Sequence, residues 1–146
     1  MSDIVSLVLA AGKGTRMKSA LPKVLHSVGG KSMVQHVLTA AATAGAERNI
    51  VVIGFGAEAV REALGDQAEF VVQTEQLGTG HAVLQAKELF ADFTGTILVL
   101  CGDTPLLTGA ELARLTEAHR GKGAVATVLT AHMPDPAGYG RVIRND

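Results

Sequence analysis

The chain has 146 residues, with thirteen Lys and Arg against fourteen Asp and Glu and a hydrophobic content of 47%. That length suffices for one domain with its own core, and no apolar run approaches the ~20 residues that a membrane-spanning helix needs. Balanced charge, with one Tyr, four Phe and no Trp, argues against nucleic acid as a partner, because both a basic surface and aromatic side chains for base stacking are lacking.

The two ends of the chain and its single cysteine indicate the compartment and the extent of the domain. Met1, Ser2 and Asp3 place no basic region before the first apolar stretch, as a secretory leader would. The lone Cys101 fits a reducing compartment, so we expect a cytoplasmic protein. The chain stops at Asp146, where a strand or hairpin is expected to continue, so we expect a fragment of a longer protein.

The first structured stretch is an apolar strand over Ile4 to Leu9 that breaks into a glycine-rich loop, Ala10-Ala11-Gly12-Lys13-Gly14-Thr15-Arg16. Glycines allow positive φ and close approach of the main chain, and successive N–H groups can form a concave anion site. Three cations lie on or near the loop: Lys13, Arg16 and Lys23. We therefore predict that it binds the polyphosphate of a nucleotide, rather than being an ordinary strand-to-helix turn.

Two commoner phosphate loops do not fit the spacing. A Walker loop has four residues between its glycines followed by Lys-Ser/Thr, whereas one residue separates Gly12 from Gly14. A dinucleotide fingerprint needs a third small residue and a long helix after the loop, but Met17 holds that position and Pro22 interrupts helix formation. A reductase that binds NAD or FAD is therefore disfavoured.

The next segments alternate between helix and strand. After a connector with a turn at Gly29-Gly30, a helix begins at Ser32, whose spacing to Gln35 predicts a capping box, and ends at Gly45. Three further elements follow in order: a strand over Asn49 to Gly54, a helix over Ala57 to Leu64, and a strand over Glu69 to Gln73.

A second glycine-rich loop, Thr74 to His81, leads into a helix with an apolar stripe formed by Ala82, Val83, Ala86, Leu89 and Phe90. The amides of Gln73 and Gln76 both donate and accept, which suits the edge of a nucleobase, and Thr79 is placed to cap the helix. The alternative is two solvated glutamines. The five histidines lack metal-ligand spacing, and each is most simply a surface or helix residue.

The rest of the chain predicts further strands around one helix. Thr96 to Cys101 is apolar on both faces, as in a buried parallel strand. Thr108 and Glu111 form a capping box for a helix that packs through Leu112 and Leu115, and further strands are expected over Ala124 to Thr130 and from Arg141 to Ile143. We predict an α/β fold of three layers with a mainly parallel sheet, whose three unusual loops meet at the carboxyl ends of the strands.

A carboxylate at a strand end beside a phosphate loop most economically holds Mg²⁺ together with substrate phosphates. We predict that Asp103 does so, the alternative being that Asp103 only initiates a turn. Arg16 and Lys23 are predicted to stabilise the leaving pyrophosphate and the α-phosphorus, because nucleotidyl transfer depends chiefly on positioning and charge. No protein nucleophile is then required.

With these motifs in place, the chain resembles a known family. LAAGKGTRM with Pro22-Lys23, QTEQLGTGHA, GDTPLL and GYGR are similar, in the same order and nearly end to end, to the bacterial N-acetylglucosamine-1-phosphate uridylyltransferases, the N-terminal domains of the bifunctional GlmU proteins. The resemblance implies a Rossmann-like nucleotidyltransferase fold. It also implies the synthesis of UDP-N-acetylglucosamine and pyrophosphate from UTP and N-acetylglucosamine 1-phosphate, with Mg²⁺ as cofactor. This reaction supplies precursors of peptidoglycan and lipopolysaccharide. The resemblance further implies that residues 1–146 are the N-terminal part of that domain, that the acetyltransferase β-helix lies beyond it, and that the longer protein is a homotrimer.

The resemblance assigns roles by position. Leu9, Ala10, Ala11 and Gly12 would contact the nucleotide, Arg16 and Lys23 its phosphates, Gln73, Gln76, Gly78 and Thr79 the uracil and nearby groups, Asp103 the metal, and Gly140 the sugar. Gly14, Thr15, Cys101 and Gly102 complete the predicted substrate-binding residues, although Cys101 stands where some members have Tyr. Two alternatives remain: another sugar-1-phosphate nucleotidyltransferase, or a sugar-nucleotide sensor without catalytic activity.

Overall fold

The computed structural model describes residues 4–144. The N-terminal Met1 to Asp3 and the end of the chain at Asn145 and Asp146, on which the expectations about a leader and a continuation rest, lie outside the described residues.

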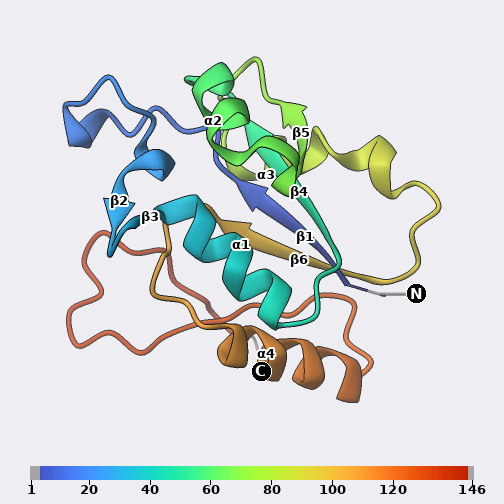
Figure 1. Cartoon of the computed structure of the whole chain (residues 1–146). Helices are drawn as coiled ribbons and strands as arrows, with labels where there is room; N and C mark the ends of the chain where they lie inside the picture. Colours follow the sequence, from blue (N-terminus) through green and yellow to red (C-terminus); the bar gives the residue numbers. More distant parts are fainter. Residues whose placement is uncertain (1–3, 145–146) are drawn as a thin grey trace.

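The centre of the molecule is a four-stranded sheet in the order β5-β4-β1-β6, in which every pair is parallel (Figure 1). Its strands are β1 (Ile4–Leu9), β4 (Arg48–Ile53), β5 (Glu69–Val72) and β6 (Thr96–Cys101). Leu9 lies opposite both Val52 and Cys101, and Ile53 lies opposite Val72. The carboxyl ends of all four strands therefore meet at one edge, and the predicted parallel sheet is confirmed.

The chain reverses its direction of travel across the sheet at β1. From β1 it moves outward to β4 through α1 (Met33–Thr43) and to β5 through α2 (Ala57–Leu64), and then returns past β1 to β6 through α3 (Thr79–Leu84). Such reversal points are where ligands bind in open α/β sheets, beyond the carboxyl ends of the strands. A ligand site is therefore expected beyond the carboxyl ends of β1 and β6.

Helices cover both faces of the sheet. One core joins side chains of α1, α2 and α4 (Gly109–Gly121) to one face, with Val8, Val51 and Leu98 from the strands. A smaller core places Ala82 and Ala86 against the other face of β1 and β4. Because connections of one hand put helices on opposite faces when the direction of travel reverses, these two cores follow from the strand order. The three-layer prediction is confirmed.

Local signals predicted from sequence hold at the helix termini. Ser32 and Thr108 accept hydrogen bonds from the backbone of Gln35 and Glu111 and form complete capping boxes for α1 and α4. Gly45 follows α1 with φ at +98°, a conformation that glycine adopts without the steric cost of a Cβ. A short antiparallel pair, β2 (Ser27–Val28) and β3 (Lys31–Ser32), closes around the predicted glycine turn.

Three sequence predictions are wrong: that both faces of β6 are covered, and that strands form over residues 124–130 and 141–143. β6 is covered by helices on its Leu98 face only. On the other face Ile97 and Val99 are 38% and 46% exposed, because the short α3 packs on β1 and β4 instead. The segments 124–130 and 141–143 form no strand and follow α4 as irregular coil (Figure 1). Their residues favour strands, but no ladder with β6 forms and Val125 is fully exposed.

The predicted helix after the second glycine loop is shorter and interrupted. α3 ends at Leu84, and a separate 3-10 helix spans Lys87–Phe90. The predicted cap is also wrong, because Thr79 is the first helical residue and Gly78 precedes it without a side-chain cap. Three more 3-10 turns occur at Thr15–Met17, Lys23–Leu25 and Gly65–Gln67. No helix among residues 4–144 is both long and apolar enough to cross a membrane.

Candidate functional site

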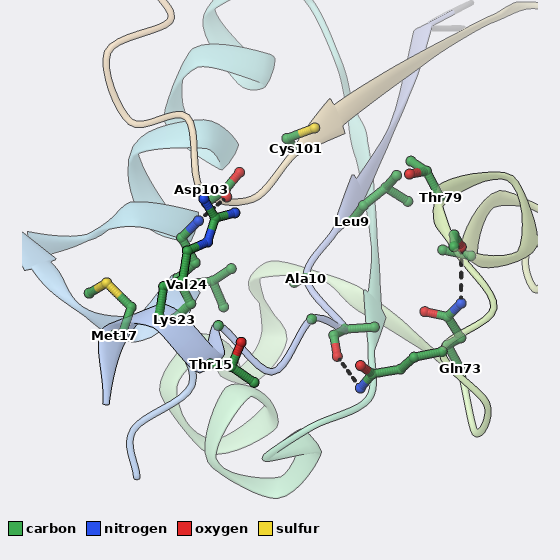
Figure 2. A pocket seen from close by; sticks show the side chains of 17 residues that line it. Leu9, Ala10, Thr15, Met17, Lys23, Val24, Gln73, Thr79, Cys101 and Asp103 are labelled. Atoms are coloured by element: carbon green, nitrogen blue, oxygen red, sulfur yellow. Dashed lines mark hydrogen bonds and ion pairs between the residues drawn. The ribbon is translucent and has the colours of Figure 1, made fainter. Parts of the chain in front are cut away.

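A pocket of about 630 Å³ opens at the carboxyl edge of the sheet, where β1 and β6 separate. Figure 2 shows Lys23 and Asp103 on one side of it, Gln73 and Thr79 on the other, and Leu9 and Ala10 between them. The lining residues are Leu9, Ala10, Ala11, Gly12, Gly14, Thr15, Arg16, Met17, Lys23, Val24, Gln73, Gln76, Gly78, Thr79, Ala82, Cys101 and Asp103. Segments up to 94 positions apart in sequence thus meet because their strands end together.

The first glycine loop presents uncommitted backbone donors to this pocket. The loop is anchored at its start, where Ala10 N–H donates to Val52 O at 2.8 Å and Ala11 O accepts from Phe55 N–H at 3.1 Å. Beyond that anchor, the N–H groups of residues 12–15 donate to no backbone carbonyl within residues 4–144. Unpaired N–H groups at consecutive positions attract an anion, and the loop has such donors over residues 12–15.

Gly14 connects this loop to Lys23. It adopts φ +60° and ψ +40°, and a Cβ added there would lie 2.6 Å from the Lys23 Cβ. The main chain and the lysine stem therefore pack without room for a side chain between them. Only glycine allows both this backbone conformation and this approach, which keeps the Lys23 ammonium on the pocket wall.

Lys23 and Asp103 form an ion pair across the end of the sheet. Lys23 Nζ donates to Asp103 Oδ2 at 2.6 Å, and about a third of each side chain is exposed. Gly102 places Asp103 there, because its N–H donates to Leu9 O at 2.9 Å and a Cβ would lie 3.0 Å from that same oxygen. Sequence reasoning had given the two side chains separate ligands and did not predict their contact, since they are 80 positions apart.

Cys101, the last residue of β6, is a thiol rather than a thiolate. Its pKa is raised, first by desolvation and then by the negative charge of Asp103, while Lys23 opposes the shift. Thiolates rather than thiols act as nucleophiles. The cysteine in the pocket is therefore poorly suited to covalent catalysis, as predicted.

The opposite wall is built around two glutamine amides. Gln76 Nε2 donates to Ala11 O at 2.9 Å and so ties the second glycine loop to the first. Gln73 is 4% exposed; its Nε2 donates to Gly78 O at 3.3 Å and lies 2.9 Å from His81 Nδ1. The predicted alternative of two solvated glutamines is wrong for Gln73, which is buried. Gln76 is exposed, although its amide also bonds to the first loop.

Most predicted site residues come together, and three exceptions stand out. Gly102 is packed beneath the pocket instead of lining it. Lys13 is exposed and is not among the residues that line the pocket. Gly140 lies in the exposed C-terminal coil, outside the pocket lining. Three apolar residues that line the pocket, Met17, Val24 and Ala82, were not predicted; only their nearness in sequence to Arg16, Lys23 and His81 could have indicated them.

The described residues contain no group of three or more His, Cys, Asp or Glu side chains that could enclose a metal. Asp103 is the carboxylate that lines the pocket. A single carboxylate suits Mg²⁺ or a similar oxygen-binding cation, whose other ligands come from phosphates and water, and suits poorly the closed, multi-ligand sites of structural zinc.

Comparison with known proteins places this geometry among nucleotide-using transferases. The pattern of one protein family, described as a MobA-like NTP transferase domain, matches residues 6–145. A curated relative, the bifunctional protein GlmU of Heliobacterium modesticaldum, is 58% identical over all 146 residues, which amount to 32% of its own length. The chain thus spans about a third of the curated relatives that it matches, and the resemblance seen in the sequence is confirmed.

Solved structures show the same arrangement of elements. The Mycobacterium tuberculosis protein Rv0371c superimposes with a TM-score of 0.70 at 28% identity, over 81% of this chain and 61% of that one. A complex of the same protein with manganese gives a TM-score of 0.64 at 28% identity, over 81% and 60% of the two chains.

Proposed function

This chain belongs to the family of MobA-like NTP transferase domains, and from that membership we propose that its pocket transfers the uridylyl group of UTP to N-acetylglucosamine 1-phosphate. The observation that carries the proposal is the set of unpaired N–H groups over residues 12–15, which face the same pocket as Lys23 and Asp103. Donors for a polyphosphate and an oxygen ligand for its counter-ion are thereby combined in one site.

Each wall of the pocket has a part in the reaction. The loop N–H groups and Arg16 bind the β- and γ-phosphates, so that negative charge developing on the departing pyrophosphate is stabilised. Lys23 lies deeper, beside the end of β1, and is placed to neutralise the α-phosphate. Gln73 and Gln76, on the other wall, receive the base.

Asp103 fits a divalent cation, and a nucleotidyltransferase neighbour of the same fold has been solved with manganese; we propose Mg²⁺ here. When bound, such an ion offsets the charge of the phosphates that react. Lys23 Nζ, 2.6 Å from Asp103 Oδ2, competes with such an ion for that oxygen, and an ion bound there opens the pair. Lys23 then turns to the α-phosphate, so that opening the pair serves both ligands.

The reaction needs no covalent enzyme intermediate. An anionic oxygen of the sugar phosphate forms a bond to the α-phosphorus of UTP, while the bond from that phosphorus to the bridging oxygen of the β-phosphate breaks. Pyrophosphate leaves with that electron pair, and no proton has to be transferred. The raised pKa of the Cys101 thiol agrees with this direct displacement.

Binding of nucleotides tests the proposal on the chain itself. We expect UTP with Mg²⁺ to bind more tightly than CTP and GTP by isothermal titration calorimetry, and Asp103→Ala to remove the dependence on Mg²⁺ while leaving the fold intact. Tighter binding of GTP or dTTP than of UTP would favour a different sugar-1-phosphate nucleotidyltransferase. Failure to bind any nucleoside triphosphate would refute the proposal.

Turnover is tested in a longer protein. We propose that residues 1–146 release little pyrophosphate alone. Gly140, the predicted sugar contact, lies outside the pocket lining, and the chain matches only 32% of the length of the relative from Heliobacterium modesticaldum. Exchanging this chain for the matching third of the Heliobacterium modesticaldum relative should give a chimera that makes UDP-N-acetylglucosamine, and Asp103→Ala in it should abolish turnover. A chimera that binds UTP without turning over would favour the sensor. The cytoplasmic location and the trimer stay predictions.

A further inference from the structure

We infer that His81 is a positioning residue that fixes which end of the Gln73 amide faces the nucleobase, and so favours uracil over cytosine; this rests on the proposed function. His81 belongs to α3 and does not line the pocket. Its effect would act through Gln73, which is 4% exposed and forms part of the pocket wall.

The orientation of the Gln73 amide follows from its partners. Gly78 O can only accept a hydrogen bond, so the amide end that lies 3.3 Å from it must be the nitrogen. The same nitrogen lies 2.9 Å from His81 Nδ1. Both N–H bonds of the amide are thereby used within the protein, and Figure 2 shows one of them as the dashed line from the Gln73 nitrogen.

The Gln73 oxygen is left facing the pocket. It accepts no hydrogen bond from any residue that the structure describes. It is also not enclosed, because the one buried side-chain nitrogen or oxygen without a partner in residues 4–144 is His26 Nε2. A nearly buried amide therefore presents a single unpaired acceptor to whatever occupies this end of the pocket.

His81 must accept at Nδ1 for this arrangement to hold, so its proton lies on Nε2. That nitrogen is 3.1 Å from Gln85 Nε2, and Gln85 Nε2 is also 3.2 Å from His81 O. Since two N–H groups cannot share one hydrogen bond, Gln85 Nε2 then donates to His81 O alone, and the ring is held through Gln73. The less exposed Gln73 determines the tautomer because its contacts have no water to replace them.

The chemistry of the bases then decides which one fits. Uracil and thymine carry an N–H donor at N3, which pairs with an acceptor such as Gln73 Oε1, whereas cytosine carries a lone pair there and would leave two acceptors facing each other. A site that leaves such a group unpaired discriminates strongly against the wrong ligand. Without His81 one N–H of Gln73 loses its partner and the amide is held only by the 3.3 Å bond to Gly78 O, so it turns more readily to offer its nitrogen.

Three variants test this by calorimetric binding of UTP, dTTP and CTP to the chain. His81→Leu should lower the ratio of UTP to CTP affinity about tenfold, with UTP and dTTP changing together. His81→Asn, whose Oδ1 takes the place of Nδ1 as an acceptor, should restore most of the ratio. His119→Leu, the same change at a half-buried position of α4 outside the pocket lining, is the matched control and should leave all three affinities unchanged.

The outcomes separate the inference from the proposed function. A His81→Leu chain that binds all three nucleotides more weakly by one common factor would show a merely structural role and overturn the inference, as would an unchanged ratio. If the unsubstituted chain binds none of the three, the proposed function fails and the inference fails with it. If the unsubstituted chain binds UTP and CTP equally, the proposed function loses its base selectivity and the inference is overturned.

Discussion

Two glycines of the first loop, two positions apart, should respond in opposite ways to the same substitution. Gly14 has φ +60° and its Cβ would lie 2.6 Å from the Lys23 Cβ. Gly12 has no atom within 4 Å of a Cβ and does not adopt positive φ, yet it lines the pocket. Gly14→Ala should therefore lower the free energy of unfolding of the chain, whereas Gly12→Ala should weaken nucleotide binding.

The magnitudes follow from separate terms. For Gly14→Ala, the left-handed conformation costs about 1–2 kcal/mol and the overpacking about 1–3 kcal/mol, less about 0.4–1 kcal/mol for a stiffer unfolded chain. The net loss is about 3 kcal/mol, or roughly 6–12 °C in Tm. For Gly12→Ala the fold should change by less than about 0.5 kcal/mol. The added Cβ holds the phosphates away from the main chain, and one N–H···phosphate bond lost in this way, about 1.5–3 kcal/mol, weakens UTP binding roughly 10- to 150-fold.

Thermal unfolding and calorimetric titration with UTP and Mg²⁺, done on both variants, measure the two effects independently. Gly14→Ala should be titrated well below its own Tm, so that folded protein is compared. The reasoning is refuted if Gly12→Ala binds UTP as tightly as the unsubstituted chain, because residues 12–15 would then not hold the phosphates. An unchanged Tm for Gly14→Ala would refute the packing argument.

Three further results are expected. Lys23→Met should bind Mn²⁺ about fivefold more tightly in the absence of nucleotide, the equivalent of ~1 kcal/mol for an exposed ion pair, and should bind UTP more weakly; unchanged Mn²⁺ affinity by electron paramagnetic resonance would contradict the competition with Asp103. Glu69→Gln removes the pair with Arg48, whose atoms are 2.5 and 2.7 Å apart, and should cost at most ~1 kcal/mol at pH 7. The hydrogen bond from Arg48 lowers the Glu69 pKa, so the stabilisation is present above the ordinary value of 4.5 and is lost as pH falls through the lowered pKa. The free energies of unfolding of the two proteins, measured in urea, should therefore converge in acid. A difference that stays constant with pH would contradict this. Cys101, with its raised pKa, should react with iodoacetamide at pH 8 more slowly than a cysteine in a short peptide, and an equal or faster rate would contradict the desolvation.

Sequence alone determined the elements whose signals are local. The capping boxes at Ser32 and Thr108, the end of α1 at Gly45 and the apolar strands depend on residues within a few positions of one another, so pattern and spacing suffice. The strand-to-loop breaks predicted after Leu9, Gln73 and Cys101 further indicated one site at one edge of the sheet, because parallel strands align their carboxyl ends.

Tertiary structure decided what depends on partners distant in sequence. The segment 124–130 has the residues of a strand but lacks a ladder, and the exposed face of β6 depends on how far α3 reaches, which no local pattern records. The same is true within the pocket, where the Lys23–Asp103 pair and the contact of Gln73 with His81 arise from packing between separate elements. Propensity specifies a conformation that a segment can adopt, but hydrogen bonds and ion pairs require that the second partner be brought within about 3 Å, and only the assembled sheet does that.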